Sequence, residues 1–136
     1  MFVNKAPTAI GTVVSIWRYP VKSMLGEELN SSYVTERGLI GDRTSALIDQ
    51  ETGKVASAKN PRKWGKLFDF RAAFIDAPQV VENIPPVRIT FPDGTQIFSS
   101  DQDYIITNTL SNVLSREVRL MRATSLHKCF REFWNG

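Results

Sequence analysis

The sequence has little of what metal sites and disulfides are made from: among its 136 residues there is one cysteine, Cys129, and one histidine, His127. A single cysteine excludes an internal disulfide and a site with several thiolate ligands. No apolar run approaches the roughly 18 residues that a helix needs to span a membrane. We therefore expect no disulfide, no metal site and no membrane partner.

The N-terminal end also lacks the features of a secretory signal peptide. No basic region precedes its apolar stretch, and Asn4, Lys5, Pro7 and Gly11 interrupt that stretch. With 42% hydrophobic residues, the chain has enough apolar side chains for one ordinary domain. A cytoplasmic domain is the expectation.

The net charge is only +3, but the charges are placed unevenly. Residues 54–71 carry six cations and one acid, whereas residues 76–103 carry five acids and one arginine. A local excess of cations favours a compact anionic ligand over nucleic acid, which requires a broadly basic surface. Ordinary solvated charge explains the pattern equally well.

The chain does contain many short apolar stretches separated by turn residues, and these predict about seven or eight short strands. We expect strands at 11–17, 28–35, 44–49, 54–58, 67–75, 87–91, 95–99 and 117–121. A helix is the rival interpretation of 67–75, where aromatic side chains at period two favour a strand. The fold class is mainly β: a small barrel-like mixed or antiparallel sheet over residues 1–122, closed or half-closed.

One helix is expected near residues 101–115, with Asp101 as its cap. Its apolar face has spacings of three and four: Ile105, Thr109, Leu110, Val113 and Leu114. The tail, 123–136, differs from the rest of the chain. Four of its large apolar residues fall on one helical face: Leu126, Phe130, Phe133 and Trp134. A short helix docked on its own barrel is favoured, and cover by a partner or a non-native end is the alternative.

Three short polar motifs stand at strand ends or turns, where a rigid scaffold presents side chains. They are Tyr19–Ser23 (YPVKS), Arg37–Arg43 (RGLIGDR) and Ala56–Arg62 (ASAKNPR). We expect cations and hydroxyls from all three to converge as a clamp for an oxyanion. These residues are Lys22, Ser23, Arg43, Ser57 and Lys59.

Each of these residues also has an ordinary structural explanation. Lys22 and Ser23 suit a turn, and Arg43 can pair with Asp42 or Glu36 on the surface. Taken singly, the structural explanation is the better one for every residue. The order of the three motifs changes that judgement.

In this order the motifs resemble the N-terminal β-barrel domain of the MOSC family, named after the C-terminal domain of molybdenum cofactor sulfurases. The mitochondrial amidoxime-reducing component and bacterial relatives belong to that family. Its pattern is YPVKS, then GL-x-x-DR, then T/S-A-x-x-x-P, found here at Tyr19–Ser23, Gly38–Arg43 and Ser57–Pro61. The resemblance runs from about Gly11 to Arg122.

The resemblance implies roles for four residues. In family members the lysine and serine of YPVKS and the arginine of DR lie near the phosphate and pterin part of the molybdenum cofactor, which points to Lys22, Ser23 and Arg43. Ser57 matches the hydroxyl of the third motif. The parent proteins are metal–sulfur oxidoreductases that reduce N-hydroxylated compounds or transfer sulfur, and pyridoxal phosphate is a further cofactor associated with them.

Two departures from the family pattern bear on activity. Met24 and Leu25 stand where the family commonly has a cysteine and a cation, while Gly26 is kept. The second domain, which carries the cysteine expected to ligate molybdenum in the family, is not among these 136 residues, and Cys129 is not expected to take the place of that cysteine. The resemblance therefore implies an accessory domain that holds no cofactor alone, has no catalytic residue of its own and works with a second MOSC domain in cis or in trans.

Two other functions stay open. A stand-alone anion-binding or protein-interaction module would take a phosphorylated small molecule or a partner protein without catalysis. A nucleic-acid-binding barrel is weaker, because the aromatic residues are placed as core rather than as a stacking platform. We expect no nucleic-acid partner.

Overall fold

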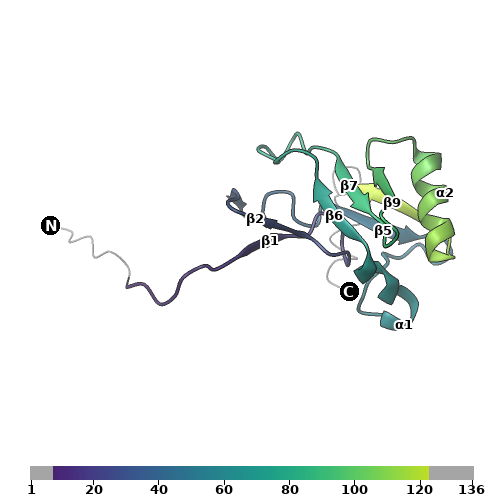
Figure 1. The fold of residues 1–136 in the computed structure, drawn as a ribbon, viewed down its shortest axis with the longest axis horizontal. Helices are drawn as coiled ribbons and strands as arrows, with labels where there is room; N and C mark the ends of the chain where they lie inside the picture. The colour runs from purple at the N-terminus through teal and green to yellow at the C-terminus, as the bar shows by residue number, and fades with distance from the viewer. Residues whose placement is uncertain (1–7, 123–136) are drawn as a thin grey trace.

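The computed structural model describes residues 8–122, and this part of the chain is mainly β, as predicted (Figure 1). The strands are β1 (Ile16–Arg18), β2 (Glu27–Leu29), β3 (Val34–Thr35), β4 (Gly38–Leu39), β5 (Ser45–Asp49), β6 (Arg71–Phe74), β7 (Val87–Thr90), β8 (Gln96–Phe98) and β9 (Val118–Arg122). The helices are α1 (Pro61–Trp64) and α2 (Asp103–Leu114), and a 3₁₀ turn, η1 (Gly65–Asp69), follows α1. The expected C-terminal helix, with His127 and Cys129, lies outside the described residues.

In residues 8–122 the strands form four sheets, and all of their pairings are antiparallel. β1 pairs with β2, β3 with β4 and β5 with β9, and β7 lies between β6 and β8. Isolated parallel bridges from Val21 to Ser45 and from Leu25 to Arg71 connect the chain after β1 to β5 and β6. Within residues 8–122 these ladders do not close into a ring, so the fold class is confirmed without the closure of a barrel.

The core lies between the β5–β9 ladder, the three-stranded sheet and α2, which runs beside β9 in Figure 1. β5 and β9 pair from Ser45 opposite Arg122 to Asp49 opposite Val118. Large, fully buried apolar side chains come from these elements, from η1 and from the residue between η1 and β6; they include Leu47, Leu67, Phe70, Ile89, Leu110 and Val118. Burying one such side chain stabilises the fold by about 1.5–3 kcal/mol.

The predicted strand at 67–75 is wrong in its first half. Pro61 occupies the first turn of α1, a position that proline favours, and η1 then carries the chain to Asp69. Phe68 is therefore 51% exposed, although period-two alternation over 67–75 puts it on the same face as Phe74. The second half forms β6, where Phe74 is buried.

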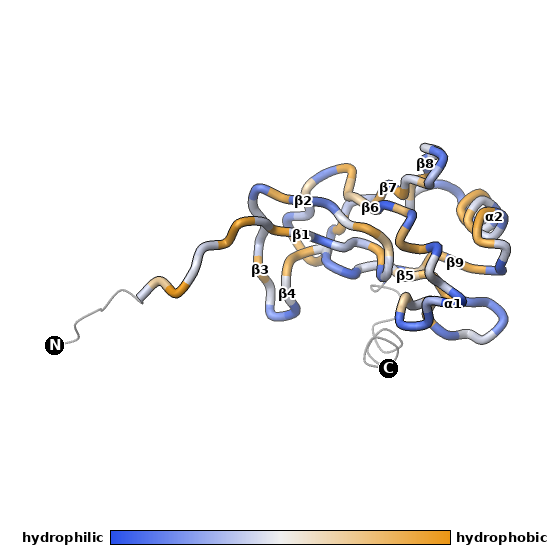
Figure 2. The backbone as a smooth tube through the Cα atoms, turned by 60° about the horizontal axis from the view of Figure 1, so that its bottom comes forward, coloured by the Kyte–Doolittle hydropathy of each residue, from blue (hydrophilic) through white to orange (hydrophobic). Residues whose placement is uncertain are grey.

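The predicted strands at 11–17, 28–35 and 54–58 are longer than the strands that form. Residues 11–15 have no ladder partner in the described part of the chain, and they lead away from the sheets (Figure 2). The side chains of Val13 and Val14 in this segment are exposed. Residues 54–58 make one bridge, Val55 to Ile48. A β-branched segment becomes a strand only where a neighbour completes its hydrogen bonds.

Helix α2 is confirmed, but its cap and its buried face differ from the prediction. Gln102 precedes the helix, while the Asp101 carboxylate accepts a hydrogen bond from the Phe98 amide instead of capping. Ile105 is 40% exposed, and Ile106 is buried in its place. The Val118 amide donates to Ser111 Oγ at 3.1 Å and so fixes the rotation of the helix against β9. None of the helices in residues 8–122 has the length and apolarity to cross a bilayer.

Candidate functional site

The first two motifs meet through their backbones. The Tyr19 amide donates to Asp42 Oδ1 at 2.8 Å, and the Arg43 amide donates to the Tyr19 carbonyl at 2.6 Å. Two further backbone hydrogen bonds complete the contact: the Lys22 amide donates to the Ser45 carbonyl, and the Ser45 amide donates to the Pro20 carbonyl, each at 3.0 Å. The proline-stiffened corner is thus held against the start of β5.

Ser23 connects the first motif to the third. Its Oγ accepts a hydrogen bond from the Ala58 amide at 2.9 Å. Ser23 has a φ of 70°, in the left-handed region that a residue with a Cβ seldom adopts. The hydrogen bond from Ala58 offsets that cost, and the Ser23 hydroxyl proton is still a donor for a second acceptor.

Lys22 is the electrostatic centre of the predicted site. Its pKa lies below the ordinary value, first because the ammonium group is partly buried and then because the positive charges of Lys59 and Arg43 act on it. Lys59 of the third motif and Arg43 of the second therefore each lie within electrostatic reach of Lys22. That these cations bind a ligand together stays a prediction.

Arg43 also has the surface pairing that the structural explanation expected. Its Nη1 donates to Asp42 Oδ2 at 3.0 Å, and its guanidinium lies 5.9 Å from the centre of the Tyr19 ring. Arg43 has a φ of 49°, a second left-handed residue among the predicted site residues. An exposed pair of this kind contributes little stability, about 0–1 kcal/mol, so the guanidinium can exchange partners at low cost.

Ser57 shows local contacts. Its Oγ accepts a hydrogen bond from the Lys59 amide at 3.2 Å, and its carbonyl accepts one from the Asn60 amide. These bonds shape the turn that carries Lys59 toward Lys22. The ligand role that the resemblance gives to Ser57 stays a prediction.

Two partly buried ion pairs support the scaffold around the site. Arg18, which is 3% exposed, bonds Glu27 Oε2 at 3.3 Å and the Ile40 carbonyl at 3.3 Å, and lies over the Phe74 ring. The same Glu27 oxygen accepts the Phe74 amide at 3.0 Å. β1, β2 and β6 are thereby tied together by one polar network.

The second pair is Asp49 with Lys63, at 2.5 Å. Burial raises the pKa of Asp49, but hydrogen bonds from Lys63 and the Glu51 amide, together with the Lys63 charge, outweigh it. The carboxyl pKa therefore lies below its ordinary value. Neither of these ion pairs was predicted, because each depends on contacts between distant segments.

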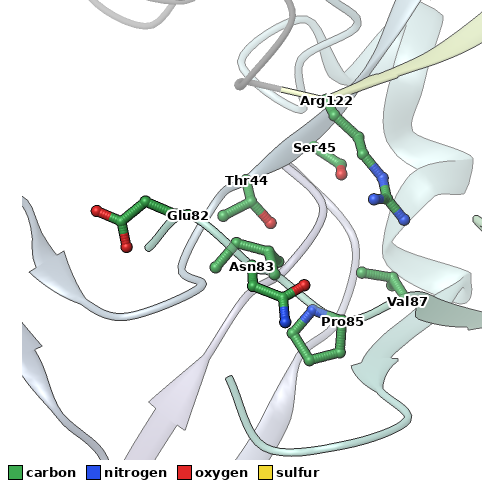
Figure 3. Close-up of a pocket in the computed structure, with 8 residues that line it drawn as sticks. Thr44, Ser45, Glu82, Asn83, Pro85, Val87 and Arg122 are labelled. Carbon is green, nitrogen blue, oxygen red and sulfur yellow. The ribbon is translucent and has the colours of Figure 1, made fainter. Parts of the chain in front are cut away.

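Sequence reasoning also missed a polar hollow beside the start of β5, lined by Thr44, Ser45, Asn83 and Arg122 (Figure 3). Thr44 and Ser45 follow the DR motif directly, which is a weak local signal. Asn83 and Arg122 carry no such signal, because the segment before β7 and the end of β9 bring them to the hollow from far along the chain.

The described residues form a small β-rich domain in which three motifs meet at turns, the arrangement of a domain that presents polar side chains from a rigid scaffold. Comparison with protein families identifies it: residues 10–83 match the MOSC N-terminal beta barrel domain. The match covers more than half of the chain, and the chain belongs to this family. Searches of curated proteins and of solved structures gave no match.

Proposed function

We propose that this domain is the accessory half of a MOSC-type protein and that it holds the phosphate and pterin part of a molybdenum cofactor, or a substrate of similar charge, from one side. The observation that carries the proposal is that Lys59 and Arg43 lie close enough to Lys22 to act on it: the pKa of Lys22 is lowered first by partial burial and then by these two positive charges. Like charges gathered at a turn repel one another, and a bound phosphate relieves that repulsion.

The donor set suits a phosphate group. Arg43 supplies a planar fork, Lys22 supplies a compact ammonium charge, and Ser23 supplies a hydroxyl donor. Ser23 is already fixed by the Ala58 amide, so its hydroxyl needs little ordering when a ligand arrives. The residues of this chain would bind and orient the group; when bound in the parent protein, the molybdenum centre supplies two-electron reduction or sulfur transfer.

A second MOSC domain, in cis or in trans, would complete the pocket. The segment before β1 supports a partner of this kind, because Ile10, Val13 and Val14 are 77% or more exposed and still lie inside the family match. No charged residue interrupts residues 8–17. An extended, uncharged apolar segment is a template for pairing with another strand.

Titration calorimetry with pyrophosphate and with a phosphorylated pterin tests the proposal. Lys22→Ala and Arg43→Ala should each weaken binding about tenfold, the scale of one charge-assisted contact. Lys66→Ala is the matched control, since Lys66 is not among the groups that shift the pKa of Lys22. Unchanged affinity in both site variants, or loss of melting temperature instead of affinity, would show that these cations are structural.

The alternative, a stand-alone anion-binding module, has the same binding residues and no need of a partner domain. Adding a MOSC domain of the amidoxime-reducing type in trans separates the two. Tighter pterin phosphate binding on addition supports the accessory role, whereas unchanged binding supports the stand-alone module.

A further inference from the structure

Two hollows lie around the end of β9, and Arg122 lines both of them. The first has a volume of about 240 Å³ and is bounded by the start of β5, residues 82–85 and the start of β7. The second, of about 360 Å³, lies toward α2 and is also lined by Arg119. Lys22 and Arg43 line neither hollow, so a ligand bound in the first hollow is independent of the proposed function.

Polar groups from three distant segments face the first hollow. Ser45 and Arg122 are directly opposite each other in the β5–β9 ladder, so their side chains lie on the same face of the sheet. Figure 3 shows the Thr44 and Ser45 hydroxyls, the Asn83 amide and the Arg122 guanidinium around one space, with the Glu82 carboxylate pointing away from it.

Arg122 is held in place without being neutralised. Its Nη2 donates to Ser99 Oγ at 2.6 Å, and Ser99 Oγ also accepts the Val87 amide at 2.8 Å. Among residues 8–122, no carboxylate lies within 4.0 Å of the Arg122 guanidinium. A guanidinium has five N–H donors, so most of them remain for a ligand.

Ser45 is 2% exposed, and its backbone is already committed: its amide bonds the Pro20 carbonyl and its carbonyl accepts the Lys22 amide. Its hydroxyl is therefore the group that it offers to the hollow. The remaining wall is made of Ile84, Pro85 and Val87, together with Glu82, whose carboxylate points away from the space in Figure 3. A few placed polar groups against an apolar wall are typical of a small-molecule site.

We propose that this hollow, centred on the Ser45–Arg122 pair, binds a small organic monocarboxylate. The carboxylate would accept hydrogen bonds from Arg122 and Ser45, with Asn83 beside it, while the apolar body packs on Pro85 and Val87. A monoanion fits better than a phosphate dianion, because the hollow has one cation and its other hydrogen-bond donors are neutral.

The test is an NMR titration of the ¹⁵N-labelled chain with benzoate, and with inorganic phosphate as the comparison ligand. Saturable shifts of the Thr44, Ser45 and Asn83 amides are expected with benzoate. Arg122→Gln should weaken benzoate binding at least about tenfold. Arg119→Gln is the matched control: it removes an arginine of the same strand that lines only the second hollow, and affinity should not change.

Asn83→Ala keeps the test decisive if Arg122→Gln does not fold, because Asn83 is exposed and its backbone bonds are unaffected. It should weaken benzoate binding about threefold to tenfold. Equal affinity in this variant and the original chain would overturn the proposal. So would shifts centred on Thr107, which lines the second hollow, or phosphate binding more tightly than benzoate. Lys22→Ala should leave benzoate binding unchanged, which separates this site from the phosphate site.

Discussion

Two parts of the described chain differ in what holds them together. Residues 8–44 contribute few of the buried apolar side chains, Val21, Met24 and Ile40, whereas residues 45–122 contribute the rest of the core. The first part is fixed instead by polar contacts, from Arg18 to Glu27 and from Tyr19 to Asp42. It also carries two of the three motifs.

The recognisable motifs and the packed core thus lie largely in different parts of the chain. The family match, residues 10–83, includes nearly all of residues 8–44, the part held by polar contacts. It ends before β7, α2 and β9. Packing tolerates many apolar combinations of the right volume. A turn that must present a cation and a hydroxyl at fixed positions tolerates far fewer substitutions, so its motif can be recognised in the sequence.

The largest effect expected is from breaking the polar network of the first part. Glu27→Ala leaves the buried Arg18 without its carboxylate and should lower the free energy of unfolding by about 3–5 kcal/mol. Glu28→Ala, an exposed neighbour on β2, should change it by less than about 0.5 kcal/mol. Urea unfolding followed by tryptophan fluorescence measures both. If the two variants behave alike, polar contacts are not what holds residues 8–44.

The next effect concerns the packed part. Leu47→Ala removes a fully buried side chain of β5 and should cost about 2–5 kcal/mol. Val34→Ala, on the 77% exposed Val34 of β3, should cost no more than about 0.5 kcal/mol. A comparable loss from both, in the same urea experiment, would mean that β3 is covered and that the contrast between the two parts is wrong.

A smaller, pH-dependent effect belongs to Asp49. Because its pKa is depressed in the folded state, its stabilisation is present above the ordinary carboxyl pKa and is lost as the pH falls through the folded pKa. Asp49→Asn should therefore cost about 1–2 kcal/mol near pH 7 and nothing at about pH 2. Glu51→Gln, on the exposed turn beside it, is the control. A constant difference between the two pH values would refute a role for the charge.

The smallest effect on stability is expected at Lys22, where the substitution should stabilise the fold slightly instead of destabilising it. The pKa of Lys22 is lower in the folded chain than in the unfolded chain, so the unfolded chain binds the proton more tightly. The free energy of unfolding therefore rises as the pH increases toward 10.5, the ordinary lysine pKa. Lys22→Met should remove this rise and leave stability at pH 7 equal or higher by up to about 0.5 kcal/mol. Melting temperatures at about pH 7 and pH 10 decide it, with Lys66→Met as the control. A clear loss of stability at neutral pH would contradict a binding role.

Sequence reasoning succeeded where the determinants are local. The turn at 92–94, β5, β7 and α2 follow from residues within a few positions of each other, and so does the presence of YPVKS and the DR motif at turns. It failed where a distant segment decides the outcome. The rotation of α2 depends on the Val118–Ser111 hydrogen bond, and residues 11–15 form no strand because nothing in the described chain completes their ladder. Arg122 could not be assigned to a site before its pairing with Ser45 was known.

The pairing of β5 with β9 has a consequence for how the domain forms during synthesis. Ser45 cannot pair with Arg122 until Arg122 has been synthesised. At a translation rate of about 5–20 residues per second this delay is roughly 4–15 s. Throughout that interval the edge of β5 that will pair with β9 lacks its ladder hydrogen bonds, and an unpaired strand edge is prone to pair with other chains. The turns at Lys22 and Arg43 emerge early but gain a firm support only when β9 leaves the ribosome, and the hollow beside Arg122 is assembled last.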